Sequence, residues 1–174
     1  MTVVVALAPA LTAASPGASC AGADVQASNT TSASFERAVV CLVNSYRKAA
    51  KRSPLRMVSS LHSAASDYAQ RMVSEHFLGH TDPDGETLGQ RLLAHRYVTS
   101  KTISWTAAEN LALAVGQNAT ARHIVRDWMG SPVHRANVLR RRLHDLGVGA
   151  IAAAPDGTGP DPVTVVMDLG SRKQ

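Results

Sequence analysis

An amphipathic pattern between Asn118 and Gly130 is the feature that most constrains the fold of this chain. Asn118 can cap a helix, Gly130 can end it, and apolar residues recur between them at intervals of three and four. Such spacing puts one apolar stripe on a helix, and that stripe must face a core. The stripe consists of Ala121, Ile124, Val125, Trp128 and Met129. Glu109 precedes this helix and His134 follows it, so we expect both at one polar cleft, together with His80.

A first helix is expected earlier in the chain, with Ser34 as its N-cap and its end before Pro54. Apolar residues follow Ser34 at spacings of four, three, one and three, which makes a single stripe. The stripe comprises Phe35, Val39, Leu42, Val43 and Tyr46. Four polar or basic residues fall off the stripe: Arg37, Asn44, Arg47 and Lys48.

Ser59 or Ser60 is expected to cap a second helix, which should stop at Gly79. Its apolar face is rich in alanine, which indicates that a neighbouring element approaches it closely. His80 would then lie just past the end of this helix. A strong turn sequence, residues 82–85, follows it directly.

The remaining segments indicate a mixed architecture. Residues 86–95 have a short helical pattern, and residues 103–115 alternate in their second half as a strand does. Ser131 and Pro132 start a short helix that should run through Leu139. Residues 146–153 and 163–169 are expected to form an antiparallel hairpin. This order predicts an α+β fold, with helices on both faces of an antiparallel sheet.

Length and composition fit one domain with a terminal extension. A chain of 174 residues, 45% of them hydrophobic, can bury a core of its own, which we place at residues 34–170. Residues 24–33 are small and polar and are expected to be a flexible lead-in, and residues 171–174 a tail. The formal charge of +5 does not call for nucleic acid. No apolar stretch of about 18 residues follows the N-terminus, so we do not expect an integral membrane protein. We expect the chain to be a monomer.

The N-terminal segment, residues 1–23, indicates export. Met1–Ala14 is apolar enough for the core of a signal peptide, and Ala21-Gly22-Ala23 is similar to a cleavage site, although a basic start is missing. The alternative is an ordinary apolar tail. In an exported protein, Cys20 and Cys41 would form one disulfide, whereas cleavage after Ala23 would remove Cys20. The two interpretations exclude each other.

Several separated motifs stand in a distinctive order along residues 34–170. They are Cys41–Asn44 with Arg47, Ala64-Ala65 through Met72, Phe77 with His80 and Asp82–Gly85, Ala108–Ala112, Trp128–Leu139, and Asp145–Gly149. In these motifs the chain resembles the CAP superfamily. That superfamily comprises cysteine-rich secretory proteins, antigen 5 allergens, plant pathogenesis-related proteins and their bacterial relatives.

The resemblance implies a secreted, extracellular protein with a three-layer α-β-α sandwich around a central antiparallel sheet. It also implies a surface cleft lined by two histidines and one or two glutamates. The histidines map to His80 and His134, and the first glutamate to Glu109. Ser131 stands where a second glutamate is often found, and Asn110 adjoins Glu109 in the same cleft. Val133 departs from the bacterial motif, which usually has glycine before the histidine, and its branched side chain restricts the backbone there.

The chemistry of this cleft has two interpretations. Two imidazoles and a carboxylate suit a divalent ion such as zinc, held by His80 and His134 with water completing the set. The alternative needs no cofactor: Glu109 hydrogen-bonds an imidazole and Asn110 a backbone group, and these contacts hold the cleft rigid. The spacing is weak evidence for metal, because nothing local is similar to H-E-x-x-H.

A serine nucleophile is a weaker interpretation. Ser131 lies three residues before His134, but its hydroxyl is expected to cap the helix that follows, and no G-x-S-x-G elbow is present. The basic residues Arg135 and 140–142 indicate a solvated face, or else a docking surface for an anionic polymer or a lipid headgroup.

We therefore expect a secreted, non-enzymatic CAP domain whose cleft binds a small ligand, a lipid or a divalent ion, with lipid or a cell-envelope component as its partner. The alternative is a hydrolase acting on peptide or cell-envelope material, with His80, Glu109 and His134 as acid, base or metal ligands. A third interpretation is a purely structural or host-interaction domain with a vestigial cleft.

Overall fold

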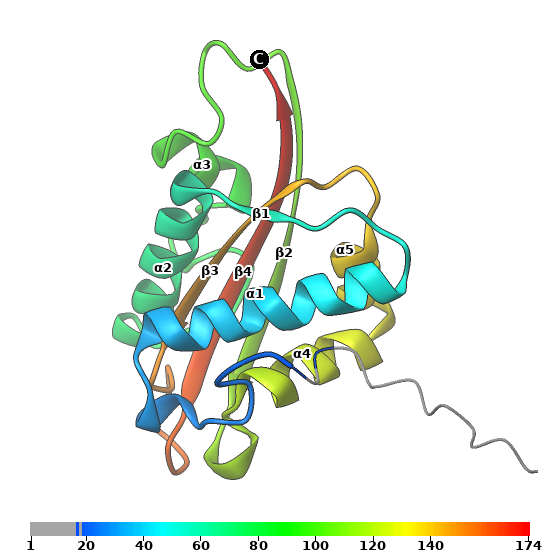
Figure 1. Ribbon diagram of the computed structural model, residues 1–174. Coiled ribbons are helices and arrows are strands. Elements are labelled where there is room, and N and C mark those ends of the chain that lie inside the picture. The colour runs from blue at the N-terminus through cyan, green and yellow to red at the C-terminus, as the bar shows by residue number, and fades with distance from the viewer. Residues whose placement is uncertain (1–16, 18) are drawn as a thin grey trace, which may run out of the picture.

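A mixed β-sheet runs through the centre of the fold (Figure 1). The structure is a computed structural model that describes residues 17 and 19–174, and in this part the strand order is β1-β3-β4-β2. Strands β2 (Ser104–Ala114), β3 (Asp145–Ile151) and β4 (Val163–Lys173) pair antiparallel, and β3 and β4 form the expected hairpin. The short β1 (Arg56–Met57) pairs with β3 in parallel, which the sequence pattern did not predict.

Helices cover both faces of this sheet, which confirms the expected fold class. On one side lie α1 (Ser32–Ala49), α4 (Ala121–Gly130) and α5 (Pro132–Leu139), and on the other α2 (Ser59–Ser74) and α3 (Leu88–Ala94) (Figure 1). The side chains of β4 alternate accordingly, because successive residues of a strand point to opposite faces. Met167 packs with the first group of helices, and Val166 packs with α2.

Glycine in β3 lets α2 lie directly on the sheet. A Cβ atom at Gly147 would stand 2.1 Å from the carbonyl carbon of Leu61, and one at Gly149 would stand 2.4 Å from Cα of Ser66. The facing side of α2 is built from small residues, among them Ala64, Ala65 and Ala69, all fully buried. The close approach predicted from these alanines is confirmed, and it positions the loop that carries His80.

Four helix ends differ from the sequence predictions. The N-cap position of α2 is Val58, which makes no side-chain capping hydrogen bond, rather than Ser59 or Ser60. The side chain of Thr31, not Ser34, caps α1 and accepts a hydrogen bond from the Ser34 amide, because Thr31 is the last residue in the extended conformation. Likewise Thr120, not Asn118, caps α4, since residues 116–118 form a 3-10 turn, η2 (Gly116–Asn118). Helix α2 ends at Ser74, well before Gly79, and His76 takes up the left-handed conformation (φ 60°) that turns the chain away.

Arg47 is the largest departure from the amphipathic pattern, because this residue off the apolar stripe is fully buried. Its guanidinium donates four hydrogen bonds to main-chain carbonyl oxygens. The acceptors are Ser53 (2.8 Å), Val138 (2.6 Å), Arg140 (3.2 Å) and Leu143 (3.1 Å). Arg47 therefore ties the end of α1 to the end of α5 and to the loop that leads into β3.

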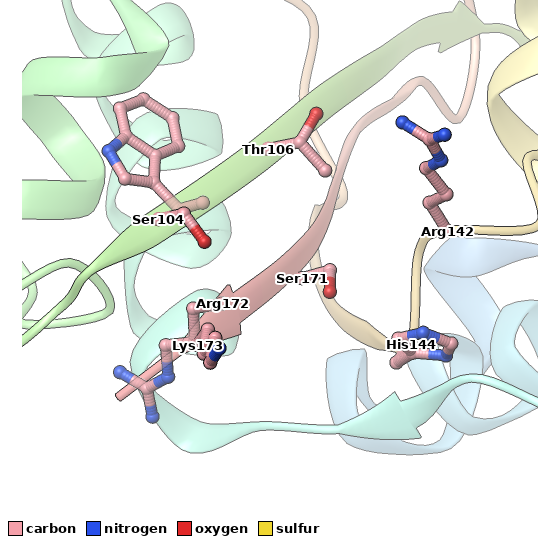
Figure 2. A pocket seen from close by; sticks show the side chains of 8 residues that line it. Ser104, Thr106, Arg142, His144, Ser171, Arg172 and Lys173 are labelled. Carbon is pink, nitrogen blue, oxygen red and sulfur yellow. The ribbon is translucent and has the colours of Figure 1, made fainter.

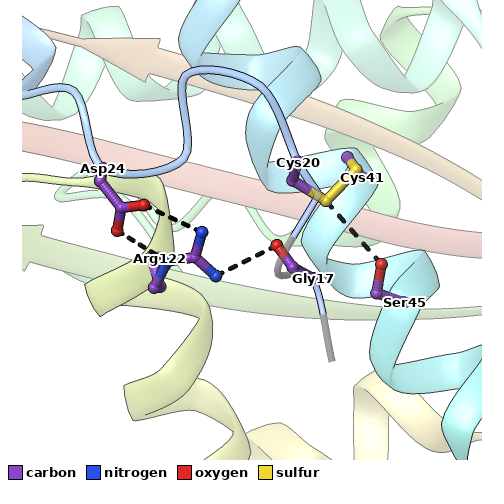
Figure 3. The surroundings of a disulfide bond; sticks show 6 residues. All are labelled: Gly17, Cys20, Asp24, Cys41, Ser45 and Arg122. Carbon is purple, nitrogen blue, oxygen red and sulfur yellow. Dashed lines mark hydrogen bonds and ion pairs between the residues drawn. A yellow bond between two sulfur atoms is a disulfide. The ribbon is translucent and has the colours of Figure 1, made fainter. Parts of the chain in front are cut away.

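A disulfide between Cys20 and Cys41 joins the N-terminal segment to α1 (Figure 3). Nearby, Arg122 of α4 pairs with Asp24, its Nε lying 2.6 Å from Oδ1, and also donates to the carbonyl of Gly17. Residues 27–29 form a 3-10 turn, η1 (Ala27–Asn29), in which Ala27 is buried. Within residues 24–33, expected as a flexible lead-in, Asp24 and Ala27 contact the domain, and Ser32 and Ala33 belong to α1.

The chain ends also bear on the domain boundaries. The signal-peptide prediction for residues 1–23 falls mainly on residues 1–16 and 18, which lie outside the described part of the chain. Cleavage after Ala23 is incompatible with the disulfide, because it would remove Cys20. Strand β4 continues through Lys173, so residues 171–173 belong to the sheet rather than to a tail. Among the helices of residues 19–174, none has both the length and the apolarity to cross a bilayer.

Candidate functional site

Glu109 is the centre of the polar cluster, and β2 determines which way it points. In this strand Ala107 and Leu111 pack with α2 and α3, so Glu109 between them faces the same layer. Its side chain is 2% exposed. A buried carboxylate needs partners, since removal from water is costly without them. Glu109 has two, one on each carboxylate oxygen.

His80 is the first partner. Its Nδ1 lies 2.7 Å from Glu109 Oε1, although the imidazole is 60% exposed. The loop that carries His80 is held to α2, because the Tyr68 hydroxyl donates to the carbonyl oxygen of Gly79 at 2.8 Å. With Nδ1 engaged by the carboxylate, Nε2 is the ring nitrogen left to contact a ligand.

Arg91 of α3 is the second partner, and the sequence analysis missed it. Its Nη2 donates to Glu109 Oε2 at 2.6 Å, and its guanidinium carbon lies 3.4 Å from the centre of the Tyr68 ring. It also donates to the main-chain carbonyls of His80 and Glu86, both at 3.3 Å. The available signal was its position between Leu88 and Leu92, which places a charged residue on the apolar side of α3.

Asn110, the next residue of β2, points to the opposite face and holds the helix that carries His134. Its Nδ2 donates to the main-chain carbonyl of His134 at 3.2 Å, and its Oδ1 accepts from Asn137 Nδ2 at 3.0 Å. Both residues named in the cofactor-free interpretation therefore make the contacts it describes: Glu109 binds an imidazole and Asn110 a backbone group. One strand thereby fixes two elements on opposite faces of the sheet.

Ser131 and Val133 differ from what was expected of them. Ser131 is the N-cap of α5 by its extended backbone, but its hydroxyl makes no capping hydrogen bond, so the capping role does not occupy it. Val133 is 71% exposed, which means that its branched side chain points mainly into solvent.

The surroundings shift the pKa values of the two imidazoles in opposite directions. The hydrogen bond that His80 donates to Glu109 raises the pKa of His80, against the opposing effects of partial burial and of Arg91. Burial lowers the pKa of His134, and the nearby His80 lowers it further. Near neutral pH, proton binding is therefore favoured at His80 and disfavoured at His134.

Asp168 lies beneath this cluster and was not predicted from the sequence. It is the register partner of Glu109 in β4, is fully buried, and neither of its oxygens has a hydrogen-bond partner. Burial raises its pKa well above the usual range, and the charge of Glu109 adds to the shift. Burial thus favours the neutral form of the Asp168 carboxyl.

The residues do not fit a zinc site built from three or more protein ligands. Nowhere in residues 17 and 19–174 do three His, Cys, Asp or Glu side chains come together in a way that could hold a metal ion. Both oxygens of Glu109 are already engaged, by His80 and by Arg91. Two imidazoles remain, fewer than the three protein ligands of catalytic zinc sites.

The sequence pattern of the family described as "CAP: Cysteine-rich secretory protein family" matches residues 40–169. This chain belongs to the CAP family. The match spans most of the domain, including both imidazoles and Glu109, and it confirms the resemblance. No curated protein sequence matches the chain.

Solved structures of bacterial proteins share the fold of this CAP domain. An outer surface protein of Borrelia burgdorferi is 22% identical with a TM-score of 0.65, and the match covers 83% of this chain and 97% of that one. An extracellular protein of Bacillus anthracis that contains an SCP domain is 20% identical with a TM-score of 0.61, covering 80% and 43%. A cysteine-rich secretory protein of Staphylococcus aureus is also 20% identical with a TM-score of 0.55, covering 80% and 39%.

Proposed function

We propose that this CAP domain is an extracellular, non-enzymatic binding domain whose cleft holds a small ligand between His80 and His134. The observation that carries the proposal is the chain of contacts from Arg91 through Glu109 to His80, at 2.6 and 2.7 Å. It fixes the orientation of a mostly exposed imidazole before any ligand arrives. Such preorganisation favours binding, because little side-chain freedom remains to be lost.

The protonation preferences of the cleft indicate the class of ligand. His80 has a raised pKa, so its Nε2 is favoured as a charged N–H donor at mildly acidic pH. His134 has a lowered pKa and stays neutral, and can therefore accept or donate one hydrogen bond. The charge of Glu109 is balanced by Arg91. A small molecule with an anionic oxygen, as found in cell-envelope material, meets these requirements.

The first test follows the ring nitrogens of both histidines by NMR during titrations with acetate and with phosphate. At about pH 6 the Nε2 signal of His80 should shift and saturate, and binding should weaken as the pH rises through the raised pKa of His80 and the imidazolium is lost. His123→Ala, which changes a histidine on α4 outside the cleft, should bind as the wild type does. A His80 signal that ignores both anions at about pH 6 would rule the proposal out.

A second test addresses the divalent ion of the sequence analysis. Zinc is titrated against the wild type and against the double variant His80→Ala, His134→Ala. A lower affinity in the double variant would place an ion at the two imidazoles, and equal affinity in both proteins would remove the ion from this cleft.

One observation favours the alternative function, a hydrolase that uses the same residues. Two imidazoles whose pKa values are pushed apart are suited to act as an acid and a base, with His80 as the acid and His134 as the base. Incubation of the purified protein with peptide and with envelope fractions tests this candidate, with Glu109→Gln as the control. Activity that survives the Glu109 change would show that another site is responsible.

A further inference from the structure

A hollow lies away from the cluster of His80 and Glu109, where β4 ends and β2 begins (Figure 2). Its volume is about 400 Å³, and its lining combines side chains from both strands with the loop between α5 and β3. Three hydroxyl groups, from Ser104, Thr106 and Ser171, share the lining with basic residues. Nothing in the proposed function of the cleft uses this hollow.

The hollow exists because the sheet continues where its helices stop. On the face covered by α1, α4 and α5, the side chains of Ala108 and Leu169 still pack into the core. One alternation further along each strand, the same face carries Thr106 and Ser171. The C-terminal end of β4 rises past these helices in Figure 1. On this face the apolar side chains stop where the helices stop covering the sheet. The stretch of sheet beyond them is polar and open to solvent.

The charged side chains that line the hollow, Arg142, Arg172 and Lys173, are all positive. A second hollow of about 320 Å³ adjoins it, shares His144, Ser171 and Arg172 with it, and adds Arg56. We call the two together the strand-end groove.

The strand-end groove also contains an acid, Asp145, but its charge is already balanced. Asp145 is buried, accepts a hydrogen bond from the Tyr97 hydroxyl at 3.0 Å, and lies 2.9 Å from Nη2 of Arg56. Arg142 and Lys173, by contrast, are both exposed. The groove therefore keeps an excess of positive charge with which an anion could pair.

We propose that the strand-end groove binds a linear, phosphate-bearing polymer outside the cell. Hydroxyl and guanidinium groups are the donors that phosphate oxygens use in proteins. Two hollows that share three residues make an elongated site, which suits a chain of charges better than a single ion. Trp105 also lines the hollow and Ile103 beside it is 73% exposed, so anionic vesicles are the comparison that separates a polymer from a lipid surface.

The probe for this proposal is inorganic polyphosphate of about 20 units, measured by calorimetry at several salt concentrations, with orthophosphate and anionic vesicles as comparisons. The wild type should bind polyphosphate at least tenfold more tightly than orthophosphate. The double variant Arg142→Ala, Lys173→Ala should bind polyphosphate about tenfold or more weakly. The slope of the logarithm of the affinity against the logarithm of the salt concentration should fall in magnitude by about two. Ser171→Ala, which removes a hydroxyl and no charge, should weaken binding without changing that slope.

A matched control separates the site from net charge. Arg37→Ala with Arg126→Ala removes the same charge from exposed positions on α1 and α4 and should leave the affinity within about threefold of the wild type. An equal loss in both double variants would mean that only overall charge matters, and the proposal would fail. It would also fail if polyphosphate did not bind, or if anionic vesicles bound and Ile103→Ser abolished that binding.

Discussion

His80 and Glu109 are 29 residues apart in the sequence, yet Nδ1 of the histidine lies 2.7 Å from Oε1 of the glutamate. The same carboxylate takes a hydrogen bond from Arg91 at 2.6 Å on its other oxygen. Glu109 therefore joins the loop after α2 and the short helix α3 to the edge strand β2. Loss of any member should affect both the stability of the domain and the properties of the imidazole.

Arg91→Met should destabilise the domain strongly. The side chains of Arg91 and Glu109 are 4% and 2% exposed, and removing one partner of a buried pair typically costs about 3–5 kcal/mol. Arg91→Lys keeps a charge but loses the planar fork and the contact with Tyr68, so it should cost less. Urea unfolding measures both variants. A free-energy loss below about 1 kcal/mol for Arg91→Met would contradict the structural role given to this pair.

The contribution of His80 to stability should depend on pH. Its pKa is raised in the folded state, so the stabilisation is complete below the unfolded pKa of about 6.5 and is lost as the pH rises through the raised value. The difference in unfolding free energy between wild type and His80→Gln should therefore be larger at about pH 5.5 than at about pH 8.5. Denaturant unfolding at both pH values checks it. If the difference in unfolding free energy grew with pH instead, folding would lower the pKa of His80 rather than raise it.

Asp168→Asn should stabilise the protein at neutral pH. Folding raises the pKa of this buried carboxyl, so the stability of the wild type falls as the pH rises above the unfolded value of 3.8. An amide avoids that ionisation and can donate to Glu109, and we expect a gain of roughly 1 kcal/mol at pH 7 that vanishes near pH 3. Thermal unfolding across this range measures the effect. A variant that is less stable at pH 7 would mean that Asp168 has a partner in its charged form.

The double variant Cys20→Ser, Cys41→Ser should be less stable by about 3 kcal/mol, because the disulfide closes a loop across 21 residues and restricts the unfolded chain. Urea unfolding of the oxidised wild type and of the variant gives the difference. The ion pair between Asp24 and Arg122 also anchors this segment, so Asp24→Asn serves as a control that should cost less than about 1 kcal/mol. If both changes had equal effects, the disulfide would not be the main anchor.

Local pattern was a reliable guide to elements and a poor guide to their ends. The stripe of α4 and the Ser131-Pro132 start of α5 predicted both helices, and the hairpin of β3 and β4 is confirmed. The caps Thr31 and Thr120 were missed, because neighbouring hydroxyl and amide side chains compete for the same role. Backbone conformation decides that competition, and it depends on how the preceding segment packs.

The sequence by itself determined the fold class and the family, and it predicted the two imidazoles and Glu109 as the site residues. Periodicity and separated motifs are properties of short stretches, and these can be identified one stretch at a time. Only the tertiary structure showed that Arg47, Arg91 and Asp168 are buried polar residues. Their burial follows from carbonyl groups, an aromatic ring and a carboxylate supplied by distant segments, and no local pattern encodes such partners.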